Sequence, residues 1–298
     1  MTEPTGAVYD LGYVPYDGPR TGRRGAIQAT VRDGVQRVLG IRRRPRKKIL
    51  PWVLIALAIT PAIVFVGFAF LSSNFSPDVE SPFASHADYF TLVGTVVFLF
   101  VALAAPELLI TDRTEGVLSI YSSRPLRADD YIWARAGGLV LVMLVFLLIP
   151  HALMYLGFAG LSSSGFADSL IDDLDKIPKI LAAAAGYIAA YAPPALLIAA
   201  FAKRKAIAAG VFLAGIPILS GIGGALIEAT DVPGHRYGGL LALAEHPSHV
   251  RDWIFGRGTG RDLTPALAGF DPWVSLAVIL GVAVVSLGIV VFRYRRLM

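Results

Sequence analysis

The chain has 298 residues, of which 55% are apolar and only 16% are charged, and its mean hydropathy is +0.62. Soluble domains carry charge on about 25% of their residues, so we expect most of this chain to be solvated by lipid. It contains no cysteine, which excludes disulfides, thiol catalysis and thiolate metal sites.

The first 48 residues predict a polar, basic tail on the cytoplasmic side, and they lack the apolar core of a signal peptide. They hold 11 of the 27 Lys and Arg residues. Residues 26–39 predict a helix, because apolar side chains recur at three- and four-residue spacing: Ile27, Val31, Val35 and Val38. We expect a basic amphipathic membrane-surface helix with this face on lipid. A solvated charged linker is the alternative.

Six apolar runs follow, each about 20 residues long, which is the length needed to cross a hydrocarbon core of about 30 Å. They cover residues 49–71, 90–110, 136–158, 180–202, 206–227 and 273–292. The fold class expected is an all-α membrane protein in which residues 49–298 form one domain of six transmembrane helices. Pro217 and a glycine-rich stretch after it predict that the fifth helix is broken or tilted.

The distribution of basic residues predicts the orientation of the chain. The tail, the 111–135 connection, the 203–205 turn and the C-terminus together hold 21 Lys and Arg, against six in the alternate connections. By the positive-inside rule both termini and the 111–135 connection face the cytoplasm. The long connection 228–272 then faces outward, where its short amphipathic stretches predict short helices or a re-entrant cap.

The 111–135 connection combines charge with apolar side chains in one short stretch. Gly116 and Pro125 punctuate a helical turn between two spans. Apolar residues on an exposed element, rimmed by charge, are typical of a protein interface; they are Val117, Leu118, Ile120, Tyr121 and Leu126. A polar loop that only follows the charge rule is the alternative.

The residue order of this connection resembles the permease of a type-2 ABC transporter, the export class with the ABCG-like membrane fold. The pattern is a span ending in a carboxylate, then Asp112-Arg113-x-x-Gly116-x-Leu118, Ser-Arg-Pro-Leu over 123–126 and Asp130-Tyr131. In that family a connecting helix on the membrane surface precedes six spans, and the coupling helix between spans 2 and 3 rests on the ATPase. Residues 26–39, the six runs and 111–135 are the counterparts. Tail residues 9–13 and 16–20 resemble those of actinobacterial permeases of this class.

The resemblance implies a permease subunit of an ATP-driven exporter in the bacterial plasma membrane, and not an enzyme. The chain has no G-x-x-x-x-G-K-[ST] phosphate loop, so ATP and Mg are expected on a separate P-loop ATPase and no cofactor on this chain. A second permease, identical or homologous, would complete the path. The almost uncharged spans favour an amphiphile as substrate, and neither a metal ion nor a nucleic acid is expected as a partner.

The resemblance also implies which residues contact the ATPase. Charged side chains would fix the register, and apolar ones would supply a packed knob. The expected set is Asp112, Arg113, Glu115, Gly116, Val117, Leu118, Tyr121, Arg124 and Pro125.

Two ionisable residues within the apolar runs support an alternative function. Glu107 lies near the end of the second run and His151 within the third. Each is a candidate pathway or boundary residue, because ionisable groups in membrane spans are expensive. Local pairing of Glu107 and a helix–helix hydrogen bond of His151 are the structural alternatives. The alternative function is an ion-gradient-driven secondary transporter or channel.

The 228–272 connection contains three candidate metal ligands close together: Glu245, His246 and His249. Pro247 breaks a regular helical spacing between them, and only His235 is available as a fourth ligand. We therefore expect these side chains to lie on a solvated loop and to bind no metal.

Overall fold

The computed structural model describes residues 18, 21–41, 46–75, 85–123, 125–258 and 262–298. Within these ranges every regular element is a helix. Six of them are long and apolar enough to cross a membrane: α2 (Arg46–Phe75), α3 (His86–Thr114), α5 (Ala128–Leu161), α7 (Lys176–Phe201), α8 (Lys205–Glu228) and α11 (Pro272–Arg295). The expectation of an all-helical, multi-pass membrane protein is therefore confirmed.

The membrane helices extend beyond the apolar runs that predicted them. α3 has 29 residues and α5 has 34, and at 1.5 Å per residue α5 is about 51 Å long. Charged residues end an apolar run without ending the helix, so the runs 90–110 and 136–158 were too short. The connection between α3 and α5 shrinks accordingly to residues 115–127, and its described residues form one short helix, α4 (Leu118–Ser122).

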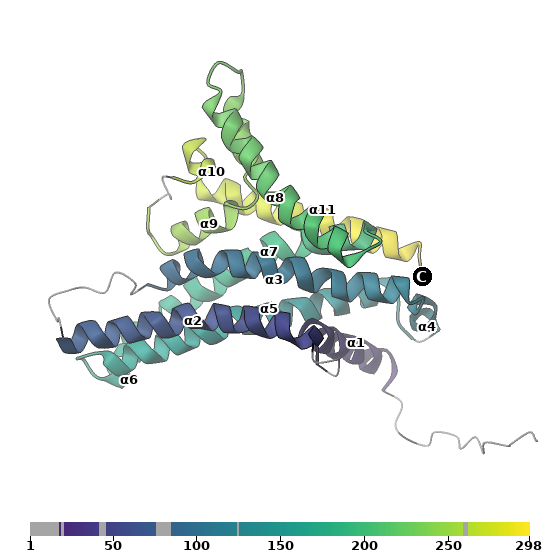
Figure 1. Ribbon diagram of the computed structural model, residues 1–298, viewed down its shortest axis with the longest axis horizontal. Helices are drawn as coiled ribbons and strands as arrows, with labels where there is room; N and C mark the ends of the chain where they lie inside the picture. Colours follow the sequence, from purple (N-terminus) through teal and green to yellow (C-terminus); the bar gives the residue numbers. More distant parts are fainter. Residues whose placement is uncertain (1–17, 19–20, 42–45, 76–84, 124, 259–261) are drawn as a thin grey trace, which may run out of the picture.

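The short elements lie at the two ends of the bundle (Figure 1). α1 (Gly22–Val38) and α4 lie at the end that also holds the C-terminus, which we call the α4 end. The opposite end, called the α9 end, carries α6 (Phe166–Asp172), η1 (His235–Leu241), α9 (His246–Ile254) and α10 (Thr264–Leu267). Short helices are therefore present in the 228–272 connection.

The spans differ in how deeply they are buried. α3 and α7 form the centre of the bundle and pack against each other, whereas only a third or fewer of the residues in the apolar stretches of α2, α8 and α11 are buried. α8 is one continuous helix with Pro217 inside it, so the predicted break is absent. Proline removes one backbone donor and bends a helix, and Figure 1 shows α8 bent.

α1 lies against α5 through a close approach of two glycines. A Cβ atom on Gly138 would lie 3.3 Å from the Cα atom of Gly34 and 3.1 Å from the carbonyl oxygen of Val31. Both contacts are with backbone, which cannot move aside as a flexible side chain can. The absence of a side chain at Gly138 is therefore what lets the two helices come this close, whereas a Cβ on Gly34 would meet no atom nearer than 3.5 Å.

The face of α1 that this contact buries consists of Thr30, Gly34 and Val38. Ile27 and Val35 pack against the core beside it. Three of the four residues of the apolar face that the sequence assigned to lipid, Ile27, Val35 and Val38, thus pack on the protein itself, and the fourth, Val31, is half-buried. Of the predicted tail, residues 1–17, 19–20 and 42–45 lie outside the described ranges.

Replacing Gly138 by valine is expected to push α1 away from α5, because the new side chain overlaps the backbone of Gly34. Overpacking of this kind costs about 1–3 kcal/mol. Amide hydrogen exchange across residues 22–38 measures the effect and should be faster in Gly138→Val. Gly137→Val is the matched control, since a Cβ at Gly137 meets nothing within 4 Å. Equal exchange in the two variants would contradict the proposed role of this contact.

Candidate functional site

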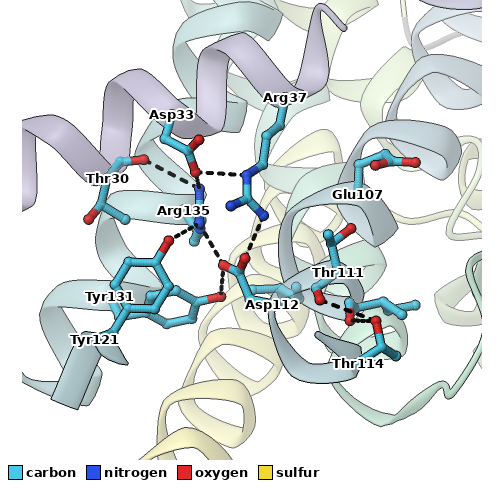
Figure 2. Close-up of polar contacts among 12 residues, drawn as sticks. Thr30, Asp33, Arg37, Glu107, Thr111, Asp112, Thr114, Tyr121, Tyr131 and Arg135 are labelled. Atoms are coloured by element: carbon cyan, nitrogen blue, oxygen red, sulfur yellow. Dashed lines mark hydrogen bonds and ion pairs between the residues drawn. The ribbon is translucent and has the colours of Figure 1, made fainter. Parts of the chain in front are cut away.

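Four charged side chains converge where α1 meets α3 and α5, and we call them the ion ring: Asp33 and Arg37 of α1, Asp112 of α3 and Arg135 of α5 (Figure 2). Asp112 Oδ1 lies 2.5 Å from Arg37 Nη1, and its Oδ2 lies 2.5 Å from Arg135 Nη2. Asp33 Oδ2 closes the ring at 2.7 Å from Arg37 Nε and 2.7 Å from Arg135 Nη1. Two positive and two negative charges thus cancel.

Two side chains of the ion ring are fully buried, so their charges need partners at short distances. Asp112 and Arg135 have 0% of their side-chain surface exposed. Taking one such ion out of water costs several kcal/mol, which only well-placed partners offset. Each of these two side chains contacts two oppositely charged partners within the ring. The ring therefore fixes α1 in place against α3 and α5.

Two tyrosines extend the ion ring to α4. Tyr131 of α5 donates its hydroxyl proton to Asp112 Oδ2 at 2.8 Å, and Arg135 Nη2 donates to the Tyr121 hydroxyl at 3.0 Å. The Arg135 guanidinium also lies 5.4 Å and 5.8 Å from the ring centroids of Tyr131 and Tyr121, within the range of a cation–π interaction. Burial raises the pKa of Tyr121, so its hydroxyl stays neutral. α4 is thereby tied to the same ring.

Arg113 points away from the solvent-facing side of α4. Its guanidinium donates to the carbonyl oxygens of Ala199, Ala200 and Ala202 at the end of α7. Arg293 of α11 donates to the Ala200 carbonyl as well, at 2.9 Å. The last carbonyls of a helix lack partners within the helix and carry its negative dipole. Arg113 therefore caps α7 and links α3 to it.

Gly116 turns the chain from α3 into α4. It has φ +69°, which a glycine adopts without strain. The backbone N–H of Val117 donates to the carbonyl oxygen of Asp112 at 3.1 Å, which is the bond of a Schellman motif. The turn thus begins at the same residue that anchors the ion ring.

The surface that the α3–α5 connection presents to solvent is small and partly apolar. Ile120 is 53% exposed, and Glu115 and Ser119 beside it are exposed too. Leu118 and Leu126 are buried, and Val117 and Tyr121 are half-buried. Of the residues expected to contact a partner, Glu115, Gly116 and Pro125 are exposed, Asp112 and Leu118 face inward, and Arg124 lies outside the described residues.

Glu107 lies beside a groove of about 280 Å³ at the α4 end, bounded by α1, α2, α3 and α8. Its Oε2 lies 2.8 Å from Lys205 Nζ. The other groove walls are mostly apolar, with Leu54, Phe100 and Ala209 among them. Glu107 is therefore both a locally paired residue and part of the lining of a groove.

His151 lies near the opposite end of the bundle, where its Nδ1 is 3.0 Å from Nδ1 of His86. Both rings are buried and packed among Tyr89 and Phe90. His86 and Glu107 are 21 positions apart on α3, a rise of about 31 Å. The two ionisable groups singled out by the sequence thus lie a full hydrocarbon thickness apart.

The three candidate ligands of the 228–272 connection do not lie on a solvated loop. His246 and His249 are 1% and 0% exposed, so that expectation was wrong. Glu245 accepts the backbone N–H of Thr264, and His235 faces the Val232 carbonyl. No cluster of three or more His, Cys, Asp or Glu suited to a metal ion occurs in the described part of the chain.

Comparison with known protein families and with characterised proteins finds no match to this chain. The residues themselves therefore carry the functional argument. Most of the ion ring, namely Asp33, Arg37 and Arg135, was not among the expected site residues. A signal was present: Asp33 and Arg37 have the spacing of an i,i+4 ion pair, and opposite charges flank the two apolar runs at Asp112 and Arg135.

Replacing Arg135 by methionine is expected to destabilise the fold strongly, because it leaves a carboxylate buried with one fewer cationic partner. Breaking a buried pair in this way costs about 3–5 kcal/mol. The melting temperature of the purified protein in detergent measures it. Arg204→Met is the control, since Arg204 is exposed at the same end. A loss of stability no greater than that of the control would refute a structural role for the ion ring.

Proposed function

We propose that the chain is the membrane-spanning permease subunit of an ATP-driven exporter, and that its α3–α5 connection docks on a separate ATPase. The observation that carries the proposal is that this connection is exposed yet held from two sides. Arg135 binds Tyr121 on one side, and Arg113 binds the end of α7 on the other. We expect an element anchored in this way to move together with the helices that hold it when a bound partner moves.

Force transmission needs rigidity behind the contact surface. The α4 surface offers Ile120 as an apolar contact and Glu115 as a charged one, a combination typical of a protein interface. Behind it, Asp112 joins the turn, the ion ring and α3. Movement of a docked ATPase would thus reach α1, α3 and α5 together.

The orientation proposed places the α4 end in the cytoplasm of a bacterial cell, with both termini on that side. Basic residues gather there: Lys203, Arg204 and Lys205 after α7, and Arg293, Arg295 and Arg296 at the C-terminus. The connections at the α9 end hold fewer Lys and Arg and more acids. This asymmetry supports the assignment by the positive-inside rule.

The substrate class that the groove favours is an amphiphile drawn from the cytoplasmic leaflet. Its walls are mostly apolar, and the Glu107–Lys205 pair at its edge offers charge to a polar headgroup. A second permease, identical or homologous, would complete the path. ATP and Mg would be bound by the partner ATPase, whose phosphate loop this chain lacks.

Replacing Ile120 by arginine should leave the fold intact, because Ile120 is exposed in this chain. The variant should not dock on the ATPase, because docking would bury the arginine without a charged partner. Affinity purification of the tagged chain from its host in mild detergent, followed by mass spectrometry, measures this. The unaltered chain should retain a stoichiometric P-loop ATPase, and Ile120→Arg should lose at least about tenfold of it.

Ile171→Arg is the matched control, because Ile171 is a similarly exposed isoleucine at the α9 end. It should retain the ATPase. If the unaltered chain brings down no P-loop ATPase even after crosslinking, the proposal fails. If Ile120→Arg binds as well as the control, the docking surface lies elsewhere.

An ion-gradient-driven transporter is the rival function, and it needs polar groups near the middle of the membrane. Glu107 and His151 lie near opposite ends of the bundle, as the length of α3 between Glu107 and His86 indicates. We therefore expect transport to stop on ATP depletion and to survive collapse of the proton gradient by an uncoupler. Uptake or efflux assays in everted vesicles distinguish the two. The reverse pattern would favour the rival.

A further inference from the structure

The segment from η1 to α9, residues 235–254, enters the bundle from the α9 end. The Ala244 backbone N–H donates to Ser220 Oγ of α8 at 3.0 Å, and the Tyr191 hydroxyl of α7 donates to the Ala244 carbonyl at 3.2 Å. Tyr191 is 15 positions along α7 from Lys176, a rise of about 22 Å. The segment therefore reaches well inside the span of α7, and we call it the re-entrant segment.

Two histidines of α9 in the re-entrant segment contact a single serine of α11. His246 Nδ1 and His249 Nδ1 each lie 2.8 Å from Ser275 Oγ. All three side chains are buried. These are the contacts through which the polar side of α9 is hydrogen-bonded to α11.

For neutral imidazole rings, the hydrogen-bond partners assign the protons of this string. His246 Nε2 is 3.2 Å from the Leu240 carbonyl oxygen, which only accepts, so Nε2 carries a proton and Nδ1 is left as an acceptor. Ser275 then donates its hydroxyl proton to His246 and accepts from His249 Nδ1–H. Nε2 of His249 remains without a proton, and it has no hydrogen-bond partner among the described residues.

Protonation of either histidine disrupts this arrangement. A proton added to His246 Nδ1 removes the acceptor of the Ser275 hydroxyl. A proton added to His249 Nε2 creates a buried donor and a buried charge without a partner, which is costly. We propose that the His246–Ser275–His249 string is a proton-sensitive latch that holds the re-entrant segment against α11 and releases it in acid.

The charged groups on the surrounding elements do not form an ion pair with His246 or His249. Burial is the main effect and lowers the pKa of both His246 and His249, although Asp252 and Asp271 act on His249, and Glu245 on His246, in the opposite sense. Glu245 caps Thr264 of α10.

The remaining neighbours are occupied by other partners. Arg251 pairs with Asp252 and donates to the Tyr187 hydroxyl of α7. Asp88 of α3 pairs with Arg257. Protonation of either histidine therefore finds little nearby charge to stabilise it.

The direction of the pH effect follows from the lowered pKa values. The open form, in which the histidines regain their ordinary pKa of about 6.5, binds protons more readily than the latched form. The latch is thus closed above that pH and weakens as the pH falls below it. Each histidine can shift the opening equilibrium by up to about tenfold per pH unit.

Amide hydrogen exchange of the full chain in detergent at pH 7.5 and 5.5, corrected for the intrinsic rate, tests the proposal. Amides of residues 242–254 should exchange up to about tenfold faster per titrating histidine at pH 5.5, and those of residues 100–112 of α3, which lie away from the buried pair His86 and His151, should not change. The double variant His246→Asn/His249→Asn cannot titrate but keeps polar groups beside Ser275, so its exchange should be independent of pH. His235→Asn is the control and should behave as the unaltered chain.

No pH difference in the unaltered chain, or a pH difference that persists in the double variant, would overturn the latch. Exchange of the histidine C2 hydrogen, followed by mass spectrometry, gives a second readout that needs no variant. His246 and His249 should titrate below the ordinary histidine pKa of about 6.5, and titration of both at that value would overturn the proposal. None of these outcomes depends on transport or on an ATPase, so the latch can fail while the proposed function stands.

Discussion

Charge compensation in the ion ring is the constraint on which the α4 end of the molecule depends. Asp112 and Arg135 sit with no exposed side-chain surface at the base of two membrane helices, a placement that neither could occupy alone. Because two of the four charges come from α1, that helix is held against α3 and α5. The glycine contact between α1 and α5 then brings the backbones close enough for the short distances in the ring.

The two ends of the bundle satisfy their buried polar groups in different ways. At the α4 end the partners are full charges arranged in a neutral ring. At the α9 end, His246, His249 and Ser275 are neutral and depend on a single pattern of protons. A ring of ion pairs is insensitive to modest changes of pH, whereas a string of neutral histidines is not. We therefore expect the packing at the α4 end to be independent of moderate changes of pH, and the packing at the α9 end to depend on pH.

Sequence reasoning predicted the six spans well, because a run of about 20 apolar residues has few other physical solutions. It did not locate their ends, since α3 and α5 continue as helices past their charged residues. It also assigned Arg113 to a partner, whereas the structure turns this side chain to the end of α7. The direction of a long side chain at a helix end depends on which helix packs beside it. Hydropathy carries no information about that neighbour, and the burial of His246 and His249 was missed for the same reason.

The end of α7 has a consequence for how the bundle can move. Arginines from two other helices, Arg113 of α3 and Arg293 of α11, share its last free carbonyls. α3, α7 and α11 are therefore joined at one level by hydrogen bonds from two arginines, and we expect them to move together. α2 and α8 take no part in this junction, and their links to α3 lie elsewhere: the Tyr89 hydroxyl of α3 donates to the Ala58 carbonyl of α2, and Lys205 of α8 pairs with Glu107. We therefore expect changes in the packing of the spans to occur first along α2 and α8, outside the junction of these three helices.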